Sequence, residues 1–249
     1  MPVAQIYQLK PGDTLGGIAV KYKLSLADLL AANQQITNPD LVMIGQLIKI
    51  PTKTPLATGQ YDGIHPAAGT ISTNRAALIF PPLTNDAGHR TPDIYADVIN
   101  QLAVGHNPRY LPGGGYTYCN IFVWDVTRAL GCPIPHWITK DGAIAVPFQS
   151  NAYEININGG VAWMQAYGVK THGWQKADAA AAQQCANQGQ VAVAMWQNPT
   201  GGHGHTAMVR PGTLTARGPA TAQAGSINFN SGHLADGFGS IEPLFYVHT

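Results

Sequence analysis

The stretch Tyr7–Pro51, YQLKPGDTLGGIAVKYKLSLADLLAANQQITNPDLVMIGQLIKIP, decides the fold of the N-terminal part of the chain. Apolar residues near its two ends predict short strands over Ile6–Leu9 and Leu47–Ile50, and Pro51 ends the second strand. The first strand leads into the turn Pro11–Asp13. The two predicted strands therefore enclose about 35 residues, which is room for one or two short helices.

Two helix signals lie between these strands. Asp13 or Thr14 can cap a first helix, whose inward residues are Leu15, Ile18, Ala19 and Tyr22. Ser25 can cap a second helix, whose inward residues are Leu26, Leu29, Leu30 and Ala31. The sequence thus predicts a strand–helix–helix–strand unit with a small core, which is only marginally stable by itself.

Four fragments of this stretch match a known family: the turn PGDTL, the helix IAVKY, the dipeptide NP and the closing GQLIKIP. With them, residues 1–52 resemble a LysM module. The resemblance implies affinity for chitin or for the glycan of peptidoglycan. It assigns binding to two loops, made of Gly12, Asp13, Thr14 and Leu15, and of Ile44 and Gly45. Gly12 can also serve the turn and Asp13 or Thr14 the helix cap, and these roles are compatible with binding.

Composition narrows the classes of partner. Charged residues make up 11% of the 249 residues, the formal net charge is +1, and no cluster of Lys and Arg appears, which argues against nucleic acid. No stretch approaches the roughly 20 apolar residues that a membrane span needs. The N-terminus lacks the features of a secretory signal, so we expect synthesis in the cytoplasm and action at the cell wall after lysis or dedicated secretion. The three cysteines are expected to be reduced thiols.

Residues 53–72 are rich in Pro, Gly, Thr and Ala without an apolar period, and we interpret them as a linker. The alternative is an irregular arm packed on the second domain, residues 73–249. Helices are predicted there over Asp93–Val104, Cys119–Gly131, Gly160–Tyr167 and Ala177–Asn187. Strands follow at Val191–Trp196, His205–Val209, Thr221–Phe229 and Ile241–Val247. Helices first and antiparallel strands later predict an α+β domain.

Cys119 is the candidate nucleophile of this domain. It opens a predicted helix after the glycine-rich loop NPRYLPGGGYTY, where the helix dipole and free amides would favour the thiolate. Cys132 lies at the exit of the same helix, and Cys185 lies within an Ala-rich helix, where it reads as a small hydrophobic residue.

A base and an orienting group are expected to meet Cys119 in space. His205 begins the apolar strand HTAMV directly after the turn GGHG, so a strand would fix its ring. Gln223 is the preferred third residue, because it falls on the next strand-like segment, and Asn228 is the second choice.

The order of these residues matches a known pattern. A cysteine that opens a helix in YCNIFVWDV, a histidine that opens a strand in GHTAMV and a later polar residue resemble the papain-like peptidoglycan hydrolases of the CHAP and NlpC types. The resemblance implies Cys119 as nucleophile and His205 as general base. Those families use His, Asn or Glu as the third residue, so Gln223 departs from their pattern. The amide of Cys119 could contribute to the oxyanion hole, and Tyr118 could contact the substrate or simply pack.

Three other interpretations stay open. His203 and His205 could form a metal pair, with His233 or Asp236 as the next ligand along the chain. Cys119 could be a core thiol in a domain that only binds. The five tryptophans could line a sugar cleft, although core packing is the commoner role of such residues.

Together these signals predict an enzyme without a cofactor or metal that cuts an amide of the peptidoglycan stem peptide, as an endopeptidase or as an N-acetylmuramoyl-L-alanine amidase. The predicted partner is peptidoglycan, both its N-acetylglucosamine-containing glycan and its stem peptide. An immunity protein or secretion machinery would be a further partner of an antibacterial effector, and a phage endolysin is the other delivery route. The alternative is a wall-binding phage or secretion-system component whose cysteine domain is inactive or acyltransferase-like.

Overall fold

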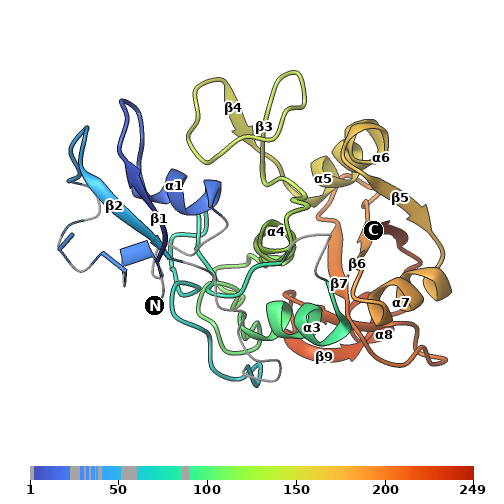
Figure 1. Ribbon diagram of the computed structural model, residues 1–249. Helices are drawn as coiled ribbons and strands as arrows, with labels where there is room; N and C mark the ends of the chain where they lie inside the picture. The colour runs from blue at the N-terminus through green and yellow to red at the C-terminus, as the bar shows by residue number, and fades with distance from the viewer. Residues whose placement is uncertain are drawn as a thin grey trace.

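The computed structural model describes residues 3–22, 29–30, 32–33, 35–36, 38, 41–51, 61–85 and 90–249. Mixed helices and antiparallel strands confirm the α+β class (Figure 1). Two separate hydrophobic clusters lie in the chain, a small one within residues 9–50 and a large one within residues 79–247. The limits of the two predicted domains fit these clusters and remain a prediction.

The small cluster belongs to the N-terminal unit. Strand β1 (Val3–Gln8) pairs antiparallel with β2 (Leu47–Pro51), and helix α1 (Leu15–Lys21) packs beside them. The second predicted helix falls mostly outside the described residues, although Leu29 is buried in this core. The amide of the fully buried Asn33 bonds the carbonyls of Leu29 and Lys49 and the Lys49 amide, each at 2.7 Å, and thereby ties this region to β2.

The described part of the expected linker is not a free connection. The Ala67 amide donates to the carbonyl of Gln101 at 2.8 Å, and the buried Thr70 accepts from the side chain of Asn107. Residues 61–72 are therefore an irregular arm packed on the second domain, so the expectation of a linker is wrong for this part. A segment rich in Pro, Gly, Thr and Ala is typical of a linker. Here its polar groups instead hydrogen-bond to the second domain, although the segment forms no helix or strand. Residues 53–60 lie outside the described ranges.

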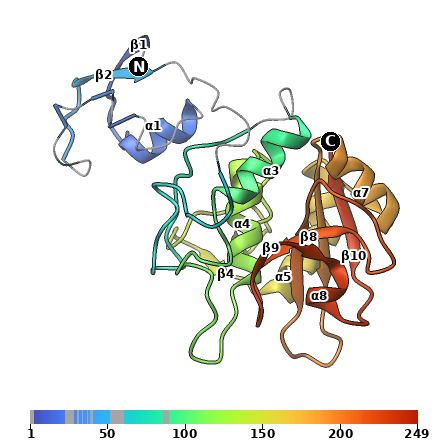
Figure 2. The ribbon, with the colours of Figure 1, turned by 90° about the horizontal axis from the view of Figure 1, so that it is seen from below.

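A six-stranded antiparallel sheet forms the centre of the second domain, in the order β5-β10-β6-β7-β8-β9 (Figure 2). Its strands are β5 (Trp174–Ala177), β6 (Val191–Trp196), β7 (His205–Val209), β8 (Ala220–Gln223), β9 (Phe229–His233) and β10 (Leu244–His248). The predicted strands β6 and β7 have the expected bounds. The single strand expected over Thr221–Phe229 is instead two strands, because a turn at residues 224–228 reverses the chain.

The helices are α3 (Pro92–Asn100), α4 (Cys119–Ala129), α5 (Ile157–Trp163), α6 (Val169–Thr171), α7 (Ala179–Asn187) and α8 (Leu234–Phe238), with a π-helical turn at Met164–Gly168. A hairpin of β3 (Trp137–Thr139) and β4 (Ala152–Glu154) follows α4. Helix α3 ends four residues before the predicted end, and Ala103 beyond it has a φ of 43° that no helix permits. Helix α4 packs on β7 and β8, which brings its N-terminus to the middle of the sheet.

Candidate functional site

Cys119 is the first residue of α4, as the sequence predicts. Its side chain is 5% exposed, and it hydrogen-bonds the backbone of Thr206, the second residue of β7. Because Thr206 directly follows His205, the thiol lies against the start of the strand that carries the expected base. The N-terminus of α4 and the start of β7 thus lie next to each other.

The protonation of Cys119 differs from the expectation. Burial raises the pKa of its thiol to about 11, against the opposing effect of the backbone hydrogen bonds from Thr206, Asn120 and Cys119 itself. The helix N-terminus therefore does not hold a thiolate in this state, because desolvation outweighs the amides and the dipole. The resting form of Cys119 is therefore a neutral thiol.

His205 lies beside Gln223, the preferred third residue. Its Nε2 is 2.7 Å from Gln223 Oε1, and the amide nitrogen of Gln223 donates to the carbonyl of Ile227 at 3.0 Å. Since a carbonyl only accepts, this second bond directs Oε1 of Gln223 toward the ring. Nε2 of His205 must then carry the proton, which leaves the lone pair of Nδ1 free to act as a base. Burial lowers the pKa of His205, against the hydrogen bond with Gln223, so its resting form is a neutral imidazole.

Helix α8 covers this pair, a feature that the sequence did not predict. The ring of Phe238 lies 4.7 Å from that of His205, centroid to centroid, and the two rings are tilted by 55°. A Cβ added at Gly237 would overlap Oε1 of Gln223, so only glycine allows α8 to lie this close. The fragment LADGF is short and half polar, and only its place over His205 reveals its role.

Asn228, the second choice for the third residue, does not face the imidazole. Its Oδ1 accepts from the Gly225 amide at 2.8 Å, and its amide nitrogen donates to the carbonyls of Val104 and Tyr110 at 3.0 and 2.9 Å. All these bonds are to the backbone, so Asn228 ties the turn after β8 to the loop that precedes α4. The alternative assignment is wrong because the side chain is fully used by the backbone.

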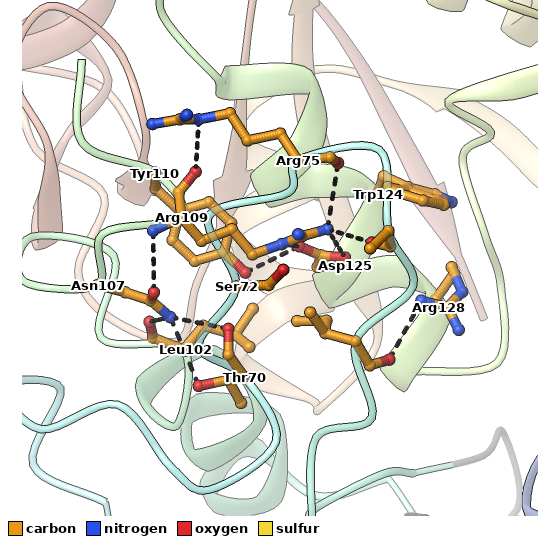
Figure 3. A network of polar contacts seen from close by, with 12 residues as sticks. Thr70, Ser72, Arg75, Leu102, Asn107, Arg109, Tyr110, Trp124, Asp125 and Arg128 are labelled. Atoms are coloured by element: carbon orange, nitrogen blue, oxygen red, sulfur yellow. Dashed lines mark hydrogen bonds and ion pairs between the residues drawn. The ribbon is translucent and has the colours of Figure 1, made fainter. Parts of the chain in front are cut away.

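A buried ion pair holds α4 in place (Figure 3). Both side chains of Arg109 and Asp125 are fully buried, and Nε of the arginine lies 2.6 Å from Oδ2 of the aspartate. Tyr110 donates its hydroxyl to the same oxygen at 2.9 Å. The other guanidinium nitrogens donate to the carbonyls of Asn74, Arg75 and Ala77, which joins the segment after the irregular arm to the helix that carries the cysteine.

Tyr118 lies at the N-cap of α4 and makes no side-chain capping bond. The Arg75 guanidinium lies 3.8 Å from its ring centroid, and the ring packs on the large hydrophobic cluster. Arg75 also donates to the carbonyls of Pro108, Arg109 and Leu111, which fixes it over the ring. These contacts give Tyr118 a packing role, and a contact with substrate stays a prediction.

The first predicted binding loop of the N-terminal unit has structural duties. The side chain of Thr14 caps α1 by accepting from the Gly17 amide at 3.0 Å, and Asp13 accepts from Tyr7 and from the Lys10 amide. Leu15 is 1% exposed, so its side chain belongs to the small core, and the binding role of the loop that contains it stays a prediction. The turn forces Gly12 to a φ of 85°.

The second predicted loop lies beside the first. The Gly45 amide donates to the carbonyl of Leu9 at 2.8 Å, and the Leu9 amide donates to Gln46 at 2.9 Å. Ile44 is 71% exposed, and its neighbour Met43 is 75% exposed. The second loop therefore presents two exposed apolar side chains beside the backbone that follows β1.

The histidines of the metal interpretation do not converge. Among the residues that the structure describes, no three His, Cys, Asp or Glu side chains gather where they could hold a metal ion. His205 uses its Nε2 for Gln223, and the His233 amide donates to Asp236 in the cap of α8. In the same described ranges, no helix is long and apolar enough to cross a bilayer.

His136 is a further residue whose role sequence reasoning missed. Its ring lies between Asn120, the residue after Cys119, and Glu154. Glu154 is 18 positions farther along the chain, so no local spacing indicates the pair.

Comparison with known proteins identifies the N-terminal unit. The LysM domain family matches residues 7–51. SpoIVD-associated factor A of Bacillus subtilis (strain 168) is 37% identical over 68 residues, which are 27% of this chain and 18% of that protein. The N-acetylmuramoyl-L-alanine amidase XlyB of the same organism is 33% identical over 108 residues, 37% of this chain and 34% of the relative. The cortical fragment-lytic enzyme of Bacillus subtilis (strain 168) is 47% identical over 47 residues, which are 19% of this chain and 11% of that protein.

Residues 7–51 are thus a LysM domain, and the family match does not extend into the second domain. The chain spans about a third or less of the length of these relatives.

Proposed function

We propose that this protein binds peptidoglycan through its LysM domain and hydrolyses an amide bond of the stem peptide with Cys119, His205 and Gln223. The contact of His205 Nε2 with Gln223 Oε1 at 2.7 Å carries the proposal, because it leaves Nδ1 free at the strand edge where the thiol lies. Two relatives whose names describe an amidase and a cortical fragment-lytic enzyme support a wall substrate.

The neutral resting pair defines the first step. When the substrate amide enters, Nδ1 of His205 takes the proton of the Cys119 thiol, and the sulfur attacks the carbonyl carbon. The C=O bond becomes an oxyanion, which the backbone amide of Cys119 at the helix N-terminus can stabilise. Gln223 accepts a hydrogen bond from Nε2 throughout and keeps the ring in orientation.

The remaining steps return the enzyme to its starting state. The oxyanion collapses, the C–N bond breaks, and the imidazolium gives its proton to the leaving amine, which leaves a thioester on Cys119. Nδ1 then takes a proton from water as the hydroxyl attacks the thioester. The C–S bond breaks, the sulfur recovers a proton from the imidazolium, and a carboxylic acid is released.

The LysM domain contributes by tethering. A weak contact with the glycan raises the effective concentration of stem peptides near Cys119, so the enzyme does not depend on tight binding of the peptide itself.

Digestion of purified sacculi tests the proposal. Wild-type protein should release soluble muropeptides with a new amine and a new carboxylate, detected by mass spectrometry. Cys119→Ala should release none above background. Cys185→Ser changes a partly exposed thiol on α7 and should digest at the wild-type rate, which makes it the matched control. Equal digestion by wild type and Cys119→Ala would exclude this nucleophile.

A second candidate function has one observation in its favour. The 5% exposure of Cys119 and its raised pKa also fit an unreactive thiol in a wall-binding protein. In that case the wild type binds sacculi and releases no muropeptide under any condition that keeps it folded.

A further inference from the structure

A second polar chain lies beside the cysteine and is not used by the proposed mechanism. Nδ1 of His136 is 3.2 Å from the amide nitrogen of Asn120, the residue after Cys119. Nε2 of His136 is 2.6 Å from Oε1 of Glu154 at the end of β4. His136 is 2% exposed, and its ring centroid lies 5.1 Å from that of Trp124, so the imidazole cannot turn freely.

The position of the proton on the His136 ring follows from the chemistry of its two neighbours, Glu154 and Asn120. A carboxylate only accepts hydrogen bonds, so Nε2 of His136, which faces Glu154, must carry a proton. The Nε2–H bond is not well aligned with Oε1 of Glu154, although the two heavy atoms are close. Burial lowers the pKa of His136, against the effect of Glu154, which makes the ring neutral. Nδ1 then has a lone pair and accepts from the NH2 group of Asn120. The amide oxygen of Asn120 is left without a partner among the described residues.

A small cavity has Asn120 in its wall. It is lined by Asn120 and Thr206, the residues that directly follow the nucleophile and the base, and by apolar side chains that include Val123, Ile134 and Ile155. Its volume is about 10 Å³, which holds roughly one water molecule or one methyl group. The cavity is therefore very small, and its wall is partly apolar and partly polar. Two amide side chains line it: Asn156, which caps α5 by accepting from the Gly159 amide, and Asn120, whose amide nitrogen is held by His136.

On this basis we propose that Asn120 binds the substrate through its Oδ1, which accepts an N–H of a stem-peptide residue whose methyl-sized side chain fills the cavity. His136 and Glu154 are positioning residues that keep the oxygen of Asn120 toward the substrate. The inference rests on the proposed function, because Asn120 directly follows Cys119 in the chain and Thr206, which also lines the cavity, directly follows His205. It adds the substrate class: a small residue with a free N–H next to the cut.

Kinetics with a soluble disaccharide-pentapeptide muropeptide test the role of Asn120. Asn120→Ala should raise KM about tenfold and change kcat by less than about twofold, since one hydrogen bond to bound substrate is lost. Stem peptides with leucine in place of alanine, one position at a time, should include one that loses at least about tenfold in kcat/KM. An unchanged KM for Asn120→Ala, or full tolerance of leucine at every position, would overturn the inference.

The positioning role has its own readout. Glu154 is 56% exposed, so Glu154→Gln should leave the fold intact while it lets the His136 tautomer and the Asn120 amide reverse. We expect KM to rise about threefold in the wild type and not to rise further in Asn120→Ala, since both changes act on one contact. Glu242→Gln, at an exposed glutamate before β10, is the matched control. Additive effects of the first two changes would show that Glu154 acts elsewhere.

Calorimetric binding of the same muropeptide separates this inference from the proposed function. Cys119→Ala protein should bind it, and the double variant with Asn120→Ala should bind about tenfold more weakly. If the wild type does not cleave but the difference in binding is present, the proposed function fails and the inference about Asn120 stands. If the wild type cleaves and the two proteins bind equally, the inference fails alone. If neither protein binds, the inference about Asn120 fails, and the proposed function fails as well only if the wild type does not cleave.

Discussion

The thiol of Cys119 and the imidazole of His205 are both neutral in the resting protein, because burial moves the two pKa values in opposite directions. A thiolate forms only as the pH rises, so alkylation of Cys119 by iodoacetamide should be slow at neutral pH. Its rate should rise roughly tenfold per pH unit until the pH approaches about 11. Peptide mass spectrometry measures this site by site. A rate that is already at its plateau below pH 7 would mean a stable thiolate–imidazolium pair.

Gln223 sets both the tautomer and the basicity of His205. Its hydrogen bond raises the pKa of the ring, so Gln223→Ala should lower that pKa further. Because the reaction needs the neutral ring, the acid limb of kcat/KM should move to lower pH. At the same time kcat should fall by about tenfold or more, since the ring loses its orientation. Gln184→Ala on α7 serves as the control, and an unmoved acid limb would remove Gln223 from the site.

At the scale of elements, α8 acts as a cover whose fit depends on one glycine. Gly237→Ala would place a methyl group on Oε1 of Gln223 and push α8 or Gln223 aside. The chain should still fold, since α8 has five residues and packs over the end of the sheet. We expect the rate of hydrolysis to fall strongly while the melting temperature changes little. Gly239→Ala would strain a residue at a φ of 58° but meets no atom nearby, and loss of stability without selective loss of activity is expected there.

Helix α4 depends on the pair Arg109 and Asp125, and removing one partner would leave a buried charge uncompensated. Arg109→Met should therefore lower the free energy of unfolding by about 3–5 kcal/mol. Arg217→Met breaks the ion pair of Arg217 with Asp236, in which the arginine is 61% exposed, and should cost at most about 1 kcal/mol. Denaturant unfolding of both variants gives the comparison. Equal losses would mean that the buried pair does not anchor the helix.

Some elements of the fold could be predicted from the sequence and others could not. Strands β6 and β7 were predicted with their bounds because continuous apolar runs and a glycine-rich turn define them locally. The start of α4 was predicted from the glycine-rich loop that precedes Cys119. The arm at residues 61–72 was only the alternative to a linker, and helix α8 and the contacts of His136 with Asn120 and Glu154 were not predicted. Each of these features depends on partners far along the sequence. The pKa of Cys119 was missed for the same reason, since burial is a property of the folded protein.

For the whole molecule, the LysM domain and the cysteine domain are expected to divide binding and chemistry. Removal of residues 1–52 should reduce retention on insoluble sacculi by about tenfold or more, because the tether to the glycan is lost. Hydrolysis of soluble muropeptides should be unchanged, since the large hydrophobic cluster contains no residue of the LysM domain. Co-sedimentation and a soluble-substrate assay measure the two effects separately. A loss of soluble activity would mean that the LysM domain contributes to the site itself.

In the proposed reaction, Cys119 becomes covalently attached to the substrate. Acid quenching of wild-type protein during turnover of a soluble muropeptide, followed by digestion and mass spectrometry, tests this directly. The peptide that contains Cys119 should carry the mass of the acyl fragment, and neutral hydroxylamine should remove it. Turnover with no adduct on Cys119, together with undiminished turnover by Cys119→Ala, would contradict the account.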